Sequence, residues 1–325
     1  MGLFLFLGMH WVFDDSTSFE DRALRLFRKQ AKHCAPYRKY LHLLNIQAEA
    51  VSSIEEIPFL PIQFFKSHTV LSDGLEAEVT FSSSGTTGME RSQHLVADLS
   101  LYKQSFRTAF EQFYGAVENY RILALLPSYL EREGSSLIYM CEDLIQKSNH
   151  PQSGFYLHNL NELAEVLKED TPTILLGVTY ALLDLAKVGP FQLHNTIVME
   201  TGGMKGQRKE LLKEELHQVL AHAFGVANIH SEYGMTELLS QAYSKGDGLF
   251  ETPRWMRVLA RDVEDPFSLV RHGKTGGLNI IDLANVHSCA FIATQDLGRV
   301  YADHTFEVLG RFEQSDIRGC NLLVQ

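Results

Sequence analysis

Residues 78–88 read Glu-Val-Thr-Phe-Ser-Ser-Ser-Gly-Thr-Thr-Gly, and this stretch decides how the rest of the chain is interpreted. The first four residues have the pattern of a strand, and the seven that follow are all serine, threonine or glycine. Backbone N–H groups and hydroxyl oxygens of such small residues can surround a phosphate closely. A serine- and glycine-rich turn without a ligand can look the same, so the interpretation depends on what accompanies it.

A second motif lies downstream at residues 231–237, Ser-Glu-Tyr-Gly-Met-Thr-Glu, after the strand-like residues 226–229. Taken alone, Tyr-Gly-x-Thr-Glu fits a turn with a solvated glutamate as well as it fits a ligand site. The presence of both motifs in one chain favours a ligand site over a bare turn for each of them.

Around the motifs, short apolar runs alternate with helical stretches. Continuous apolar runs, typical of strands buried on both faces, occupy 121–127, 173–178 and 196–199. Helices are predicted at about 98–113, 159–168, 179–187 and 206–223, the last ending at Gly225. This alternation predicts an α/β fold with a mostly parallel sheet flanked by helices. From about residue 255 onwards, the runs predict a smaller β subdomain and include 278–281 and 291–294.

The N-terminal region predicts one amphipathic helix. Thr17 and Glu20 have the spacing of a capping box, and apolar residues recur at helical intervals from Ala23 until Pro36 ends the pattern. The segment 58–66 has no helical period and predicts a rigid extended entry.

The composition is that of an ordinary globular protein, and its charge disfavours some functions. The chain of 325 residues has 29 basic and 40 acidic side chains, which gives a formal net charge of −11. Without a lysine- and arginine-rich run, this balance argues against nucleic-acid binding. The cysteines, Cys34, Cys141, Cys289 and Cys320, have neither paired nor metal-ligand spacing, which fits a reducing cytoplasm. The apolar residues 1–9 are too few to span a membrane and lack the basic region of a signal peptide.

In their order, the two motifs resemble those of the adenylate-forming superfamily of acyl- and aryl-CoA ligases, luciferases and peptide-synthetase adenylation domains. Further segments extend the resemblance over residues 80–320. Residues 294–299 look like the superfamily's Thr-Gly-Asp-x-Gly segment with Gln295 in place of glycine. The hinge is matched by 310–311 and 317–319, and the adenine pocket by 201–203. The resemblance implies ATP and Mg²⁺ as cofactors and a large adenylate-forming N-terminal domain as the fold.

Within the superfamily, the chain most resembles the acyl-protein synthetase (LuxE) family, a component of the bacterial luminescence fatty-acid reductase. Segments 24–41 and 57–66 look like that family's N-terminal part, and Cys320 stands near the C terminus, where the family carries its acyl-accepting cysteine. The resemblance implies activation of a fatty or aromatic carboxylic acid, transfer of the acyl group to a thiol, and a reductase subunit as a partner. Residues 1–310 are then the adenylate-forming domain, with a β-rich subdomain from about 255 to 310, and residues 311–325 are a hinge-like tail.

The resemblance also implies a role for each motif residue. The phosphates would be held by Ser83, Ser84, Gly85, Thr86, Thr87 and Gly88. Glu237 would ligate Mg²⁺ and Thr236 would bond the α-phosphate, while Asp296 and Arg311 would fix the ribose. The remaining nucleotide contacts would come from Gly202, Gly203, Tyr233 and Gly234. Cys320 would be the nucleophile of the second step, and Arg318 would favour its thiolate.

Two departures from the superfamily pattern bear on the activity. Gly88 is followed by Met-Glu-Arg instead of Pro-Lys, and the sequence stops just past the hinge, before the superfamily's C-terminal domain and catalytic lysine. A cation from elsewhere should then assist adenylation; the candidates are Lys66 and Lys205, although each also fits an ordinary surface lysine. Two other functions stay open: a CoA ligase of the phenylacetate-CoA ligase type that uses an external thiol, and a non-catalytic nucleotide-binding subunit.

Overall fold

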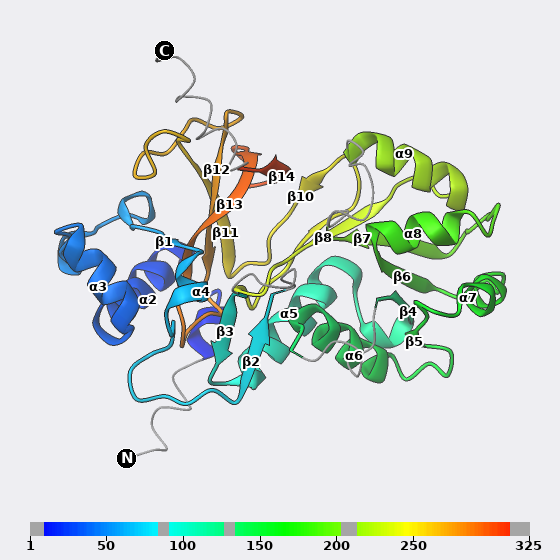
Figure 1. The fold of residues 1–325 in the computed structure, drawn as a ribbon, viewed down its shortest axis with the longest axis horizontal. Helices are drawn as coiled ribbons and strands as arrows, with labels where there is room; N and C mark the ends of the chain where they lie inside the picture. Colours follow the sequence, from blue (N-terminus) through cyan, green and yellow to red (C-terminus); the bar gives the residue numbers. More distant parts are fainter. Residues whose placement is uncertain (1–9, 84–90, 127–133, 203–212, 313–325) are drawn as a thin grey trace, which may run out of the picture.

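The apolar run at 173–178 lies near the centre of a six-stranded sheet, called here the first sheet (Figure 1). The computed structural model describes residues 10–83, 91–126, 134–202 and 213–312. The strands follow the order β5, β4, β6, β7, β8, β9, and only β9 is antiparallel to its neighbour. They are β4 Arg121–Leu125, β5 Gly154–Phe155, β6 Thr173–Val178, β7 Thr196–Thr201, β8 His230–Tyr233 and β9 Ala242–Ser244. Every residue of β4 and β6 is buried, which confirms the interpretation of their apolar runs.

Helices lie on both faces of the first sheet, with α5 and α6 on one face and α8 and α9 on the other (Figure 1). They are α5 Leu99–Tyr114, α6 Ser136–Ser148, α7 Leu160–Val166, α8 Thr179–Ala186 and α9 Lys213–Phe224. The sequence predicts all of these except α6, which is an addition. Gly225 has a φ of +67° directly after α9, so the predicted end of that helix is confirmed.

The second sheet contains the strands expected in the β subdomain. Its order is β10, β14, β13, β12, β11, and these neighbours are antiparallel. They are β10 Leu249–Phe250, β11 Met256–Arg261, β12 Thr275–Asp282, β13 Phe291–Val300 and β14 Phe306–Arg311. The short strand β1 Leu60–Pro61 adds to β13 in parallel, next to Ile292 and Ala293.

The N-terminal segments pack against the second sheet (Figure 1). They are η1 His10–Phe13, α2 Phe19–His33, α3 Ala35–Leu43, η2 Ala48–Ala50, η3 Ile54–Glu56 and α4 Phe64–Ser67. Phe27 of α2 packs edge-on against Phe291 of β13 with ring centroids 5.8 Å apart. The amide of Gln30 donates a 2.6 Å hydrogen bond to the backbone oxygen of Asn285, 255 residues away, and its oxygen accepts one from the N–H of Ala290. Residues from opposite ends of the chain therefore build this half of the molecule.

Two local predictions about this region differ from the structure, and one is confirmed. The cap of α2 is Ser18, whose hydroxyl accepts a hydrogen bond from the N–H of Asp21, one residue later than the predicted pair at Thr17 and Glu20. The predicted end of this helix before Pro36 is confirmed, since α2 ends at His33 and Pro36 lies in the first turn of the next helix, α3. The predicted extended entry holds for β1 but is followed by the helical turn α4.

A two-stranded hairpin, β2 Val79–Ser82 and β3 Gln93–Val96, lies between the two sheets (Figure 1). A buried network also joins the two halves of the molecule. Asp282, at the end of β12, accepts hydrogen bonds from the N–H groups of Leu239 and Ser240 and from the Ser240 hydroxyl, at 2.7, 3.0 and 2.6 Å. Trp255 donates its indole N–H to Ser240 and to Ser105 of α5.

The second motif begins inside a strand rather than after one. Residues 226–229 were expected as the strand, but the turn that ends α9, with a bond from the Val226 N–H to the Ala221 oxygen, occupies the start of that stretch. Pairing with β7 starts only at His230, and so places Ser231 and Glu232 in the sheet.

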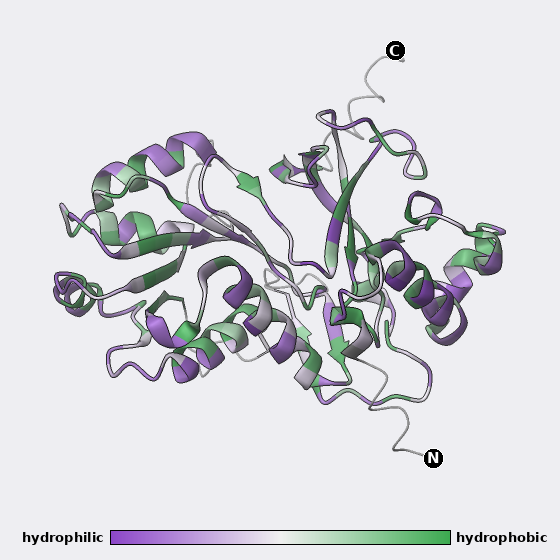
Figure 2. Ribbon diagram, turned by 180° about the vertical axis from the view of Figure 1, so that it is seen from behind, coloured by the Kyte–Doolittle hydropathy of each residue, from purple (hydrophilic) through white to green (hydrophobic). Residues whose placement is uncertain are grey.

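Figure 2 shows hydrophilic and hydrophobic residues mixed along the helices that cover the sheets, as expected for helices with one buried face. Within the described ranges, no helix has the length and apolar character that crossing a membrane requires.

Candidate functional site

The second motif starts inside β8 and continues past the carboxyl end of that strand, where Tyr233 meets the second sheet. The phenolic hydroxyl of Tyr233 donates a 2.7 Å hydrogen bond to Oδ2 of Asp296, in the middle of β13. Nε of Arg311, the last residue of β14, donates a 3.1 Å bond to Oδ1 of the same carboxylate. The Asp296 side chain is 8% exposed and that of Arg311 is 77% exposed, so this group reaches from the interior to the surface. Open α/β sheets commonly bind ligands at such carboxyl ends.

Aromatic rings hold Tyr233 in place. Phe250 and Phe306 each meet the Tyr233 ring edge-on, with centroids 5.8 and 5.5 Å away, and stack on each other at 5.3 Å. Nζ of Lys213 lies 4.3 Å from the centre of the Phe250 ring. Burial, and after it the negative charge of Asp296, raises the pKa of Tyr233 well above its usual range, so the phenol stays protonated and donates.

Glu237 is a buried carboxylate, only 5% exposed. Burial raises the pKa of its carboxyl group above the ordinary value, while a hydrogen bond from Ser92 and the positive charges of Arg311 and Lys66 act in the opposite direction. The positive charges of Arg311 and of the exposed Lys66 therefore both act on the Glu237 carboxyl group.

The first motif is anchored where it enters and leaves the hairpin. The N–H of Ser83 donates a 3.1 Å bond to the oxygen of Ser92, and the N–H of Ser92 donates a 3.0 Å bond to Oγ of Ser83. This reciprocal pair closes the segment between them. The predicted phosphate-binding residues Ser84, Gly85, Thr86, Thr87 and Gly88 lie outside the described residues, as do Gly203, Lys205 and Cys320.

The predicted glycines have different structural settings. Gly202, exposed and with a φ of +66°, follows β7, and its carbonyl oxygen accepts a 2.8 Å bond from the Thr179 hydroxyl. Strand pairing of Thr201 with Glu232 places Gly202 beside Tyr233. A Cβ at Gly234 would come within 2.5 Å of an oxygen of Glu232, so a larger residue there would force the Glu232 side chain to shift.

Sequence reasoning missed several polar residues that brace this edge of the sheet. Glu200 on β7 is buried and forms an ion pair with Lys213 of α9 at 3.2 Å, and Nε2 of His217 lies 3.6 Å from the same carboxylate. Although burial raises the pKa of Glu200, hydrogen bonds and nearby positive charge outweigh it, and the pKa lies below its ordinary value. Glu232 accepts a short hydrogen bond from the hydroxyl of Thr201. Glu200 and Glu232 lie inside strand-like runs, which do not predict these contacts. The only sequence signal for them is that a charged residue lies in each run.

The motif turn after β8 is held by side chains from three directions. The Asn285 amide donates a 2.9 Å hydrogen bond to the backbone oxygen of Glu237. The Asp282 carboxylate accepts hydrogen bonds from the backbone N–H groups of Leu239 and Ser240. Nδ1 of His94 lies 2.8 Å from the oxygen of Thr236. The backbone that carries Thr236 and Glu237 is thus fixed on both sides.

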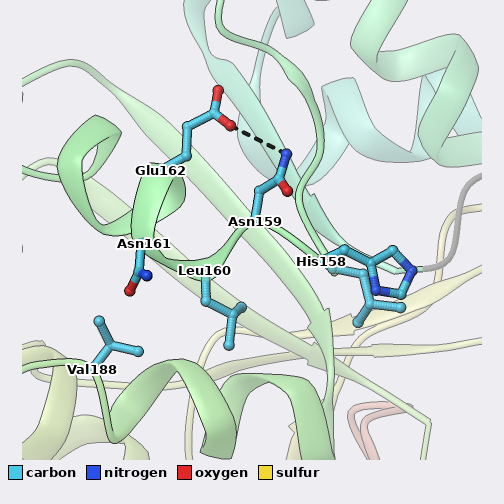
Figure 3. Close-up of a pocket in the computed structure, with 7 residues that line it drawn as sticks. His158, Asn159, Leu160, Asn161, Glu162 and Val188 are labelled. Carbon is cyan, nitrogen blue, oxygen red and sulfur yellow. Dashed lines mark hydrogen bonds between the residues drawn. The ribbon is translucent and has the colours of Figure 1, made fainter.

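One open hollow lies away from the motif residues (Figure 3). It has a volume of about 580 Å³ and is lined by residues 157–162 and Val188, at the start of α7 and after α8. None of the described motif residues lines it, and the Asn159 amide within it bonds Glu162. This hollow contributes nothing to the site built by the motifs.

Three comparisons with known proteins agree with this geometry. The model of the family "Acyl-protein synthetase, LuxE" matches residues 8–118 and 135–325. Relatives from Vibrio harveyi and Aliivibrio fischeri, each named a long-chain-fatty-acid–luciferin-component ligase, are 24% and 22% identical and cover 98% of this chain and 91% of their own.

Among solved structures, a 2-hydroxyisobutyryl-CoA ligase in the postadenylation state has a TM-score of 0.67 at 12% identity, over 90% of this chain and 67% of that one. ATP-bound MatB from Rhodopseudomonas palustris has a TM-score of 0.55 at 15% identity, over 71% of this chain and 47% of that one. The chain thus matches about half the length of MatB.

The chain has the fold of the adenylate-forming ligases. Its family match and its relatives identify it as an enzyme of the ligase class. The family match covers nearly the whole sequence. The chain belongs to the acyl-protein synthetase, LuxE, family.

Proposed function

We propose that the enzyme uses ATP to activate a carboxylic acid as an acyl-adenylate and then passes the acyl group to the thiol of Cys320. The observation that carries this proposal is the meeting of Tyr233, Asp296 and Arg311, from both sheets, beside the buried Glu237. A nucleotide pocket and a metal-binding carboxylate are the two parts that adenylation needs.

The proposed reaction has two chemical steps, adenylation of the acid and transfer of the acyl group to the thiol. In the first, an oxygen of the acid attacks the α-phosphorus of ATP, a new P–O bond forms, and the bond to the bridging oxygen breaks as pyrophosphate leaves. In the second, the Cys320 thiol loses its proton to solvent, its sulfur attacks the acyl carbon, and the C–O bond breaks as AMP leaves.

The described residues suit the nucleoside. Each Asp296 oxygen accepts one bond from the protein, and a carboxylate oxygen has a second lone pair, so both can also accept from ribose hydroxyls. Arg311, which is exposed, would contact the ribose from the solvent side. Tyr233 and the exposed backbone of Gly202, in neighbouring strand positions, would flank the adenine.

Glu237 suits Mg²⁺, which takes one or two carboxylates together with substrate phosphates and water. Among the described residues no group of three or more acidic, histidine or cysteine side chains could hold a metal. Glu237 would bind Mg²⁺ together with the phosphates and water. A cation bound there would neutralise charge on the phosphates. Thr236, next to it, would bond the α-phosphate, and Ser83 would hold the start of the phosphate motif.

Lys66 is our candidate for the positive charge that assists adenylation. It is exposed on α4, and its positive charge opposes the burial that raises the pKa of Glu237. A solvated ammonium so placed can approach a phosphate without breaking any ion pair found among the described residues.

The names of the relatives support a long-chain fatty acid as the substrate. We further propose a reductase subunit as the consumer of the acyl group and the cytoplasm as the location, since an acceptor thiol must stay reduced. Residues 1–310 would act as the adenylate-forming unit and residues 311–325 as the tail that carries Cys320.

ATP–pyrophosphate exchange, screened over fatty, aromatic and amino acids, tests the proposal. Exchange with one acid class and none without acid is the expected result. ATP binding without exchange would favour a non-catalytic nucleotide-binding subunit. AMP release that depends on CoA would favour the ligase that uses an external thiol.

A further inference from the structure

His94 of β3 is a buried side chain that joins three parts of the molecule. Its Nδ1 lies 2.8 Å from the backbone oxygen of Thr236, and its Nε2 lies 3.0 Å from Oγ of Ser288. Its ring meets the ring of Phe65 edge-on at 5.6 Å, and only 1% of the residue is exposed. The hairpin, the motif turn and the loop before β13 therefore converge on one imidazole.

The contacts fix the tautomer of this imidazole. A carbonyl oxygen can only accept, so Nδ1 carries the hydrogen and donates it to Thr236. Nε2 is then the acceptor of the Ser288 hydroxyl. Burial lowers the pKa of His94 to about 4, which keeps the ring neutral at physiological pH.

Ser92 and His94 are two residues apart in an extended segment, so their side chains leave the chain on the same face. Both are buried, at 3% and 1% exposure, while Gln93 between them is exposed. Ser92 bonds the carboxylate of Glu237, and His94 bonds the carbonyl of the preceding residue, Thr236. Ser92 is also the residue whose backbone closes the phosphate-motif segment with Ser83.

We infer that His94 is a positioning residue that fixes Thr236 and Glu237 in register with the hairpin carrying the phosphate motif. The inference rests on the proposed function for its effect on catalysis. Three side chains hold the motif turn. Asp282 ends β12 and Asn285 lies in the turn that follows it, whereas His94 comes from the hairpin. It links the proposed phosphate loop to the proposed metal ligand.

Two substitutions of His94 separate positioning from packing. His94→Asn keeps a donor near the place of Nδ1, whereas His94→Phe keeps the ring and removes the donor. In ATP–pyrophosphate exchange, we expect His94→Phe to lower the rate at least about tenfold, as for a lost buried hydrogen bond, and to raise the Mg²⁺ concentration needed for half-maximal rate. His94→Asn should stay within about threefold of the wild type. His42→Phe, at an exposed histidine of α3, is the matched control.

Amide hydrogen exchange gives a readout that does not depend on activity. The N–H groups of Leu238, Leu239 and Ser240 are bonded to Met235 and Asp282, so they are protected while the turn is held. His94→Phe should speed their exchange at least about tenfold, and His94→Asn should not. Equal effects of the two variants, or unchanged exchange in His94→Phe, would overturn the inference. An inactive wild type would refute the proposed function, and the amide exchange would still decide the role of His94.

Discussion

The hydroxyl of Tyr233 and the carboxylate of Asp296, 2.7 Å apart, form a direct polar contact between the parallel first sheet and the antiparallel second sheet. Because the two residues lie on different sheets, the contact exists only while β8 and β13 keep their relative position. A ligand that engages Asp296 would therefore bind a carboxylate that both halves of the molecule hold in place.

We expect Asp296→Asn to weaken ATP binding about ten- to hundredfold, because hydrogen bonds to a charged group contribute about 1.5–3 kcal/mol. Isothermal titration measures this. Tyr233→Phe is the paired variant, since it removes the bond to Asp296 but leaves the carboxylate for the ribose. If both variants weakened binding equally, Asp296 would act only by holding Tyr233.

Glu237→Gln should abolish pyrophosphate exchange while the protein stays folded, because an amide is a poor Mg²⁺ ligand of nearly the same shape. Its carbonyl oxygen can still accept from Ser92, so the melting temperature should not fall. Glu264→Gln, at an exposed glutamate, is the control for substitution alone. Normal exchange in Glu237→Gln would remove this residue from the metal role.

Lys66→Gln should slow adenylation while leaving the affinity for ATP within a few-fold, if its charge acts mainly on the transition state. Lys66→Arg should keep most of the rate. Lys39→Gln, also at an exposed lysine, should have no effect. Single-turnover rates and ATP affinity together distinguish these outcomes, and an unaltered rate in Lys66→Gln would make it an ordinary surface lysine.

Cys320→Ser should lose acyl labelling from ATP, Mg²⁺ and a radiolabelled fatty acid but keep pyrophosphate exchange, because adenylation precedes the thiol step. The wild-type label should resist acid and be released by neutral hydroxylamine. The other cysteines are poor competitors: Cys34, Cys141 and Cys289 are buried, and burial raises the thiol pKa of Cys34 to about 11. Label that persists in Cys320→Ser would place the acceptor elsewhere, and an unlabelled wild type with intact exchange would favour an external thiol.

Stability should depend on pH through His94. Burial lowers its pKa from 6.5 to about 4 in the folded state, so the unfolded chain binds the proton first as the pH falls. The stabilisation from the neutral ring is complete above about pH 6.5 and is lost as the pH falls toward 4. The free energy of unfolding, measured with urea, should therefore change less steeply with pH in His94→Asn than in the wild type. Between about pH 4 and 6.5 the two slopes should differ by up to about 1.4 kcal/mol per pH unit. Burial also lowers the pKa values of His230 and His287 to about 4, but both residues are present in the wild type and in the variant, so their contributions cancel in the comparison. Identical slopes for the two proteins would contradict the prediction.

The fold was predictable because strands buried on both faces give continuous apolar runs, as at 121–127 and 173–178. The motif residues Tyr233 and Asp296 were predictable from local patterns that resemble a known family. Their mutual contact was not, because it joins positions 63 residues apart. His94 and Asp282 were missed for the same physical reason: each acts through partners that only the tertiary fold brings near.

The sequence analysis also missed the helix α6, whose signals are single residues at its two ends. The helix α6 begins at the cap Ser135, whose hydroxyl accepts from the N–H of Ile138, and ends before Asn149 in the left-handed conformation. Both are recognised helix-boundary residues, and together they could have revealed α6. At 226–229 the sequence analysis instead predicted a strand that is not there. The apolar Val226 belongs to the turn that ends α9, and the strand β8 begins at His230.

The bond between Gln30 and Asn285 has a consequence for how the protein is made. At about 5–20 residues per second, a ribosome needs roughly 10–50 s to synthesise the 255 residues that separate them. During that time α2 has emerged without β13, and Phe27 has no Phe291 to pack against. This half of the enzyme can therefore assemble only after β13 has been synthesised, and until then the apolar face of α2 is open to chaperones and to neighbouring nascent chains.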